Sequence, residues 1–346
     1  MTQPLKVVLA GCGGMSKAWL NTATQIEGVQ VVGLVDVVAA AAEARRDEFG
    51  LSEACMFTDL EAALGELRPD IVFDVTIPEA HTQNAVTAFA HGSHVLSEKP
   101  MSHSLSEAQR ALDASRAAGV QYGVMQNRRF QHQIRRVREL VRSNALGGLT
   151  TVNVDFFIGA HFGGFRDHMK HVLLLDMAIH TFDALRYVSG ADAEAVYCRE
   201  WNPVGSWYDH DASAVAVFEM SNGIVATYRG SWCSEGLATT WESDWRLIGT
   251  RGSARWDGGD AFQAEVVPAD APAAFRRAVE PVVLPELDTT GLENGHDSCI
   301  RDFVDAVRSG RTSETPASDN IKSLAMVFGA IESAEAGCRQ IIAGRS

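Results

Sequence analysis

The stretch that decides the fold lies near the start of the chain and reads LKVVLAGCGGMS, residues 5–16. Its first half, Leu5–Ala10, is mostly apolar and has the pattern of a buried strand. A glycine-rich turn follows, and a helical pattern opens at Ser16. Glycine at positions 11 and 13 permits a tight turn and lets backbone N–H groups approach an anion, which the helix N-terminus also attracts. Strand, turn and helix together predict a phosphate-binding site.

Strand and helix patterns alternate from residue 5 to about residue 125. The expected strands are Leu5–Ala10, Val29–Val35, Ile71–Val75, His94–Ser97 and Gln121–Val124. The expected helices are Ser16–Gln25, Ala39–Glu48, Leu60–Leu67, His81–Ala90 and Leu105–Ala118. This alternation is typical of βαβ units in a parallel, doubly wound sheet. We therefore predict an α/β fold that begins with a dinucleotide-binding Rossmann domain over residues 1–126.

The pattern changes after residue 126. The expected strands are Thr150–Ile158, Ala195–Glu200, Ala212–Glu219, Ile224–Ser231 and Trp245–Ile248, with hairpin turns at Gly223, Gly249 and Gly252. The expected helices are Gln131–Arg142, Leu174–Val188, one near Cys299–Arg308 and Asn320–Ala336. Residues 258–295 show no clear pattern. For residues 127–346 we predict an α+β domain with a large, open, mainly antiparallel sheet and helices on one face.

Composition narrows the class of protein. The 346 residues are 46% hydrophobic and 21% charged, which suits a two-domain globular chain. The net charge of −14 argues against nucleic acid as a partner. We find no signal peptide and no apolar run that could span a membrane, and the six cysteines include no C-x-x-C pair. These features predict a cytoplasmic protein with no membrane partner, disulfide framework or structural zinc.

The dinucleotide site is predicted from the glycine-rich turn and from one carboxylate. The turn residues expected to bind the cofactor are Gly11, Gly13, Gly14, Met15 and Ser16. Asp36 ends the second strand, where an acidic side chain contacts the ribose hydroxyls. Because a carboxylate accepts hydrogen bonds from a free diol but repels a 2′-phosphate, we expect NAD and not NADP. Arg45 and Arg46 lie about nine residues further on and are not expected at the phosphate.

A candidate catalytic lysine follows the fifth expected strand, in the tripeptide Glu98-Lys99-Pro100. Ligands of doubly wound sheets bind at the carboxyl ends of the strands, and Pro100 restricts Lys99 to an extended backbone. The ammonium could donate to a substrate hydroxyl and stabilise the alkoxide that develops as hydride leaves. The tripeptide alone favours a surface turn that holds an ordinary ion pair.

The expected helix Leu174–Val188 carries a second candidate pair. Asp176 and His180 are four residues apart and share a face in an otherwise apolar setting. The aspartate could orient the imidazole, which would accept a proton as hydride leaves. A capping aspartate and a core histidine would give the same pattern. No metal is expected, because the nearby histidines show no recognised zinc spacing.

These motifs occur together in one order, and together they resemble the Gfo/Idh/MocA family, the glucose–fructose oxidoreductases and inositol dehydrogenases. The resemblance covers essentially the whole chain. The motifs are Gly11–Ser16, Asp36, Thr76-Ile77-Pro78 with His81, Glu98-Lys99-Pro100, Asn127-Arg128-Arg129-Phe130, Asp176-x-x-x-His180, Gly249-Thr250-x-Gly252 and Gly295-His296 before Asp302-Phe303.

The resemblance implies roles for these residues. Lys99, Asp176 and His180 would form the catalytic set. The residues implied on the nicotinamide side of the NAD site are Thr76, Pro78, His81 and Glu98. Arg128 joins the candidates for substrate binding. The resemblance also implies a second domain that binds substrate and forms oligomers, so a homodimer or homotetramer is expected.

The substrate is less defined than the cofactor. Arg166, His168 and Lys170 cluster before the catalytic helix and could bind an anionic group, or they could form a solvated loop. The family resemblance implies an oxidoreductase that transfers hydride between NAD and a hydroxyl of a sugar, sugar derivative or cyclitol. A second interpretation is an NAD-dependent glycosidase that oxidises its sugar transiently. A third is a non-catalytic NAD-binding regulator, which would not need Lys99, Asp176 and His180 together.

Overall fold

The computed structural model describes residues 3–288 and 295–342, which fall into two compact units. Of these described residues, one unit comprises 3–130 with 295–321, and the other comprises 131–288 with 322–342. Helix α8 (His296–Ser309) therefore belongs to the first unit. The division predicted from sequence, 1–126 and 127–346, assigned this helix to the second domain.

The first unit contains a fully parallel six-stranded sheet in the order β3-β2-β1-β4-β5-β6. Its strands are β1 (Leu5–Ala10), β2 (Val29–Val35), β3 (Cys55–Phe57), β4 (Ile71–Asp74), β5 (His94–Ser97) and β6 (Tyr122–Val124). Its helices are α1 (Ser16–Ala23), α2 (Ala39–Glu48), α3 (Leu60–Leu67), α4 (Pro78–Ala90), α5 (Leu105–Ala118) and α8, with the short helix η1 (Asn127–Phe130). The predicted doubly wound sheet is confirmed. Its strand order reverses between β1 and β4, and ligands of such sheets bind at that crevice.

Helix α8 completes the core of the first unit. Its residues Ile300, Phe303 and Val304 are buried in the same apolar cluster as Trp19 of α1 and Phe73 of β4. Trp19 and Phe73 pack edge to face, with their ring centroids 5.2 Å apart. Burying this face removes from water the apolar stripe of α8, which is the main source of stability for an amphipathic helix.

The second unit is built on a nine-stranded sheet in the order β14-β13-β12-β11-β7-β10-β9-β8-β15. Its strands are β7 (Leu149–Phe157), β8 (Ala193–Trp201), β9 (Ser213–Met220), β10 (Val225–Ser231), β11 (Asp244–Gly249), β12 (Gly252–Trp256), β13 (Phe262–Val266), β14 (Glu280–Pro281) and β15 (Gln340–Ile341). The pair β7–β10 is parallel, and the other pairs are antiparallel. The predicted mainly antiparallel sheet is confirmed.

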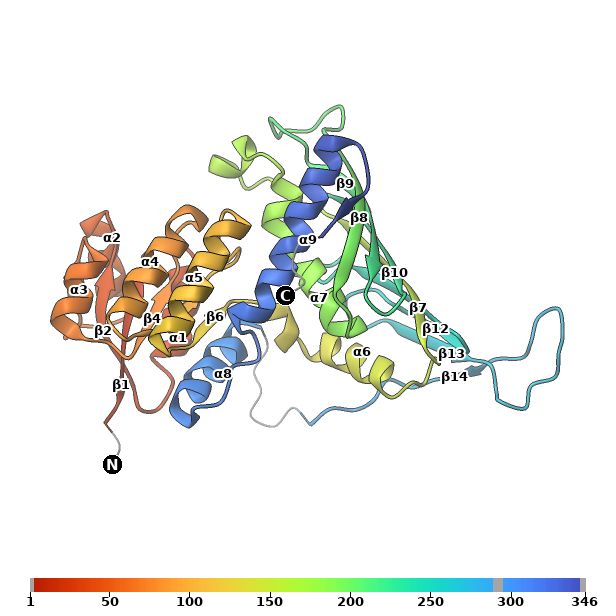
Figure 1. Cartoon of the computed structure of the whole chain (residues 1–346), viewed down its shortest axis with the longest axis horizontal. Helices are drawn as coiled ribbons and strands as arrows, with labels where there is room; N and C mark the ends of the chain where they lie inside the picture. Colours follow the sequence, from red (N-terminus) through yellow and green to blue (C-terminus); the bar gives the residue numbers. More distant parts are fainter. Residues whose placement is uncertain (1–2, 289–294, 343–346) are drawn as a thin grey trace. The chain divides into compact units, whose positions relative to one another are not determined.

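Helices cover one face of this sheet (Figure 1). They are α6 (His132–Arg142), α7 (Ile179–Ser189) and α9 (Ala317–Ala336), the last of which begins in the first unit. Phe182 of α7 packs edge to face on Phe218 of β9 and Tyr228 of β10, at centroid distances of 4.8 and 5.2 Å. These contacts fix α7 on the sheet.

The segment that carries the candidate catalytic pair is not one regular helix. A π-helical stretch, η3 (Leu173–Ala178), runs directly into α7, where a single helix Leu174–Val188 was predicted. Asp176 lies in the π-helical part and His180 near the start of α7. Stretches of π-helix occur frequently at functional sites. Across residues 3–288 and 295–342, no helix has both the length and the apolar character needed to cross a membrane.

Candidate active site

The glycine-rich turn lies at the carboxyl end of β1, on the reversal of strand order. Gly11 has a φ of +91°, and a Cβ there would lie 2.5 Å from the carbonyl oxygen of Val75. At Gly13 and Gly14 a Cβ would meet nothing within 4 Å. The backbone is therefore tightly packed at Gly11 and open at Gly13 and Gly14. The open side leaves room for the phosphates of a dinucleotide to approach the turn. Met15, at the N-terminus of α1, is 41% exposed.

Asp36 is held beside this turn by the backbone. Its Oδ2 accepts a hydrogen bond from the N–H of Cys12 at 2.8 Å, and its Oδ1 accepts one from Val38 at 2.8 Å. Each carboxylate oxygen has a second lone pair, so both can still accept from a ribose diol. The carboxylate is therefore fixed in orientation before any nucleotide binds.

Arg45 of α2 also contacts the turn, which sequence reasoning did not anticipate. Its Nε donates to Ser16 Oγ at 2.9 Å, and its Nη2 donates to the carbonyl of Gly13 at 3.2 Å. Ser16 Oγ donates in turn to Gly13 at 2.6 Å. No local sequence signal marks this contact, because Arg45 lies about 30 residues from the turn. The guanidinium holds the turn to α2.

A buried polar network follows the end of β4. Asp74 and His81 are both fully buried, and His81 Nδ1 lies 3.1 Å from Asp74 Oδ2. Thr76 Oγ1 donates to Asp74 Oδ1 at 2.5 Å and accepts from Asn84 at 3.1 Å. Thr76 is half-buried, as is Pro78 at the first turn of α4. His81 and Thr76 therefore both contact the carboxylate of Asp74, and the sequence reasoning missed Asp74 and Asn84.

Glu98 and Lys99 follow the end of β5. Glu98 is buried; its Oε1 accepts from the indole N–H of Trp19 at 2.8 Å, and its Oε2 accepts from the backbone N–H of Lys99 at 3.1 Å. The Lys99–Pro100 peptide is cis. Lys99 is half-buried at the same edge of the sheet as the glycine-rich turn, because the strands are parallel.

A histidine that the sequence reasoning left without a role joins this group. His296 opens α8, and its Nδ1 lies 3.3 Å from Asn127 Nδ2. Burial lowers the pKa of His296, the charge of Glu98 works against this shift, and that of Lys99 adds to it. An imidazole whose pKa lies below that of a free histidine therefore stands near Glu98 and Lys99. The motif Gly295-His296 is visible in the sequence, but its spacing indicates no function.

In the second unit, Asp176 is tied to Arg166. The guanidinium donates through Nε to Asp176 Oδ2 at 2.8 Å and through Nη2 to Oδ1 at 3.4 Å. Arg166 also lies over the rings of Phe162 and Phe165, 5.0 and 4.8 Å from their centroids. Asp176 has 12% of its side chain exposed, and His180 is 9% exposed. Both candidates are nearly buried, and the bidentate contact fixes the carboxylate.

The structure separates the residues predicted to bind substrate. Arg166 contacts Asp176, whereas His168 lies 2.5 Å from Asp209. Lys170 is exposed. Arg128 belongs to the first unit and is 4% exposed. The segment looks basic in sequence, but two carboxylates from elsewhere in the chain offset its charge.

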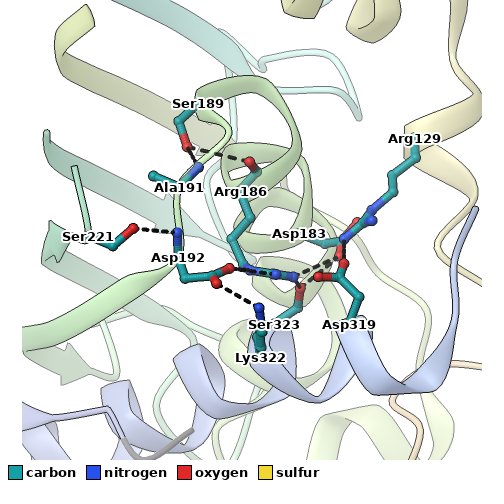
Figure 2. Close-up of polar contacts among 10 residues, drawn as sticks. All are labelled: Arg129, Asp183, Arg186, Ser189, Ala191, Asp192, Ser221, Asp319, Lys322 and Ser323. Atoms are coloured by element: carbon teal, nitrogen blue, oxygen red, sulfur yellow. Dashed lines mark hydrogen bonds and ion pairs between the residues drawn. The ribbon is translucent and has the colours of Figure 1, made fainter. Parts of the chain in front are cut away.

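Asp183 lies on the same helix as His180, but its contacts are with residues that hold the fold together (Figure 2). It is fully buried and accepts a hydrogen bond from Ser323 Oγ of α9 at 2.7 Å. Arg186 donates to Ser323 at 2.8 Å and to Asp192 at 2.6 Å. In the first unit, Figure 2 also shows the ion pair of Arg129 with Asp319, at 2.7 Å. Asp183 therefore joins α7 to α9.

The described part of the chain contains no group of three or more His, Cys, Asp or Glu side chains arranged to bind a metal ion. What it does contain is a glycine-rich turn after β1, a carboxylate held beside that turn, a lysine after β5 of the same sheet and an Asp–His pair in the second unit. This fold and this set of residues define a nucleotide-dependent oxidoreductase.

Comparison with known families agrees. Residues 5–126 match the model described as "Oxidoreductase family, NAD-binding Rossmann fold", and residues 134–255 match the "GFO/IDH/MocA C-terminal domain". The chain belongs to the Gfo/Idh/MocA family of NAD-binding oxidoreductases. The family and the cofactor expected from the sequence are thereby confirmed.

Relatives extend over both units. The chain is 26% identical over 251 residues to a 1,5-anhydro-D-fructose reductase of Ensifer adhaerens, covering 71% of this chain and 73% of the relative. It is 28% identical over 232 residues to an inositol 2-dehydrogenase of Paenarthrobacter aurescens, covering 65% and 66%. An oxidoreductase from Agrobacterium radiobacter, solved in complex with NAD⁺, L-tartaric acid and magnesium, shares the fold with a TM-score of 0.85 at 22% identity, over 98% and 99% of the two chains.

Proposed function

We propose that the protein is a dehydrogenase that moves hydride between NAD and a hydroxyl-bearing carbon of a sugar, sugar derivative or cyclitol. The observation that carries the proposal is the pair Asp176 and His180, nearly buried and one helical turn apart, in a chain that also presents Lys99 at a strand end of its Rossmann sheet. The names of the two curated relatives, a sugar-derivative reductase and a cyclitol dehydrogenase, support the substrate class.

Each of the three side chains has a distinct task. Bound NAD supplies the hydride acceptor. His180 accepts the proton of the substrate hydroxyl, and Asp176 orients the hydroxyl and the imidazole. Arg166 keeps the Asp176 carboxylate in one orientation through its two hydrogen bonds. Lys99 donates a hydrogen bond to the substrate oxygen and stabilises the negative charge that develops on it.

Asp36 determines which nucleotide binds. We expect NADP to bind at least about tenfold more weakly than NAD, a difference of about 1.4 kcal/mol, because its 2′-phosphate would meet a carboxylate held by Cys12 and Val38. Titration of both nucleotides, followed by fluorescence or calorimetry, measures the ratio. An Asp36→Asn protein keeps the volume of the side chain and loses its charge, so the ratio of NAD affinity to NADP affinity should fall towards one. Equal affinities in the wild type would remove Asp36 from this role.

The substrate is proposed to be a neutral polyol. Of the basic residues proposed to bind substrate, Arg166 is hydrogen-bonded to Asp176, which matches its charge through two hydrogen bonds. An anionic substrate would have to compete with Asp176 for the guanidinium. A hydroxyl-rich substrate would instead accept from Arg166 and Lys99 and donate to Asp176 without displacing an ion pair.

The reaction type is tested by stoichiometry. Net oxidation leaves one NADH for each product, so absorbance at the NADH band should rise in step with product when sugars, sugar acids, cyclitols and glycosides are screened with NAD. Repeated turnover of a glycoside with trace NAD and no accumulation of NADH would identify a transient-oxidation glycosidase. Tight NAD binding without turnover of any compound would indicate a regulator.

A further inference from the structure

His171 has an unusual backbone conformation next to the catalytic segment. Its φ is +52°, in the left-handed region that residues other than glycine seldom adopt, although asparagine, aspartate and histidine adopt it more often than the rest. A histidine at such a position costs free energy, so other contacts must hold it there. His171 is also the residue whose carbonyl accepts the N–H of Leu175, at 2.9 Å. Its backbone therefore closes the first turn of η3, the segment that carries Asp176.

The side chain of His171 is anchored to two other elements of the second unit. Its Nδ1 lies 2.7 Å from Oε2 of Glu200 on β8, and its Nε2 lies 3.7 Å from Oε1 of Glu335 on α9. Only 2% of the Glu200 side chain is exposed, against 21% for His171. The imidazole thus connects the start of η3 to the sheet and to α9.

The charges around this ring favour its protonated form. The hydrogen bond with Glu200 raises the pKa of His171, burial works against this, and the charges of Glu200, Glu335 and Asp211 raise it further. Burial raises the pKa of Glu200, and the hydrogen bond with His171 opposes that shift. Lys170 precedes His171 in the chain and is exposed to solvent. The ring keeps its proton to a higher pH than a free histidine does.

We propose that charged His171 is a positioning residue, which by binding Glu200 and Glu335 fixes the first turn of the segment that carries Asp176 and, one turn later, His180. The proposal rests on the function proposed above for those two residues. When the ring loses its proton, the ion pairs weaken while the cost of the left-handed backbone remains. Asp176 then loses its fixed position relative to the sheet, and kcat falls.

The sign of the pH effect follows. The folded-state pKa of His171 lies above its unfolded value, so the stabilisation of this turn is complete below the unfolded-state pKa while Glu200 and Glu335 remain ionised, and it disappears as pH rises through the folded-state pKa. Wild-type kcat should therefore decline on the alkaline side. Amide exchange in residues 172–180, corrected for its intrinsic pH dependence, should accelerate over the same pH range.

Three variants test the proposal. His171→Asn suits a left-handed backbone and does not titrate, so it should lose the alkaline decline, lower kcat by up to about a hundredfold with little change in KM, and exchange rapidly at residues 172–180 at every pH. His171→Gly removes the backbone strain as well as the ring and should behave in the same way. Glu200→Gln keeps the imidazole but removes its buried partner, and should move the alkaline decline to lower pH.

The matched control is His161→Asn. His161 also lies 2.7 Å from a glutamate, Glu235, but both side chains are more than half exposed. This variant should keep the wild-type pH profile and exchange rates. If His171→Asn and His171→Gly retain the alkaline decline and normal exchange of residues 172–180, the proposal is wrong. If no compound is ever turned over, the exchange measurements still decide the positioning role, while the proposed function alone fails.

Discussion

A folded His180→Ala protein should turn over its substrate about 10²–10⁴ times more slowly than the wild type, the usual contribution of a positioned base. Its affinity for NAD should stay near the wild-type value. His180 belongs to the second compact unit, whereas the glycine-rich turn and Asp36 belong to the first. The substitution therefore removes the proposed proton acceptor and should leave the dinucleotide site intact.

Measurement of kcat, KM and NAD affinity on the same preparation separates the two effects. Lys99→Ala should lose turnover to a similar degree, because it removes the donor to the developing alkoxide. Circular dichroism and a melting curve establish that each variant is folded. A folded His180→Ala protein with full turnover would contradict the catalytic assignment.

Arg186→Ala should lower the free energy of unfolding by about 3–5 kcal/mol, the usual effect of removing one partner of a buried ion pair. Only 5% of the Arg186 side chain is exposed, and its Nη1 lies 3.9 Å from Oδ1 of fully buried Asp183. The truncated protein would leave the Asp183 carboxylate buried without this cation. It would also lose the hydrogen bonds from Arg186 to Ser323 and Asp192 (Figure 2).

Urea unfolding of the second unit provides the measurement, because buried Trp232, Trp245 and Trp256 all lie in that unit. Lys322→Ala is the matched control. Lys322 forms a 2.7 Å ion pair with Asp192 in the same network, but both side chains are about two-fifths exposed. An exposed pair contributes about 0–1 kcal/mol. A similar small loss for Arg186→Ala would show that the buried network does not stabilise the unit.

Sequence reasoning located the Rossmann sheet well, for a physical reason. Its strands are covered on both faces, so β1, β2 and β5 are mainly apolar and largely buried, and their predicted bounds match the structure. Strand β3 was missed because it has three residues and two of them are exposed. In the second sheet, β12 to β15 were missed, because β14 and β15 have two residues each and β13 lies in the stretch without a pattern.

The candidate site was predictable only where a motif is local. Gly11, Asp36 and Lys99 each follow a strand, so the order of elements marks them. Arg45, by contrast, reaches the glycine-rich turn from the next helix, and His296 approaches Glu98 and Lys99 from a helix almost 200 residues further along. Nor does any sequence period reveal that Asp176 lies in a π-helical stretch, since its i, i+4 spacing to His180 suits an ordinary helix as well.

The return of α8 to the first unit has a consequence for how the protein is made. A ribosome releases residues 1–130 long before α8, yet Ile300, Phe303 and Val304 belong to the core of that unit. Until residue 309 has been translated, the apolar surface that α8 covers has no native partner. The nucleotide-binding unit can therefore be completed only after most of the second unit has emerged from the ribosome. Because the first unit is made of two separate segments of the chain, a single proteolytic cut could not release it intact, and a gene fusion at one junction could not replace it.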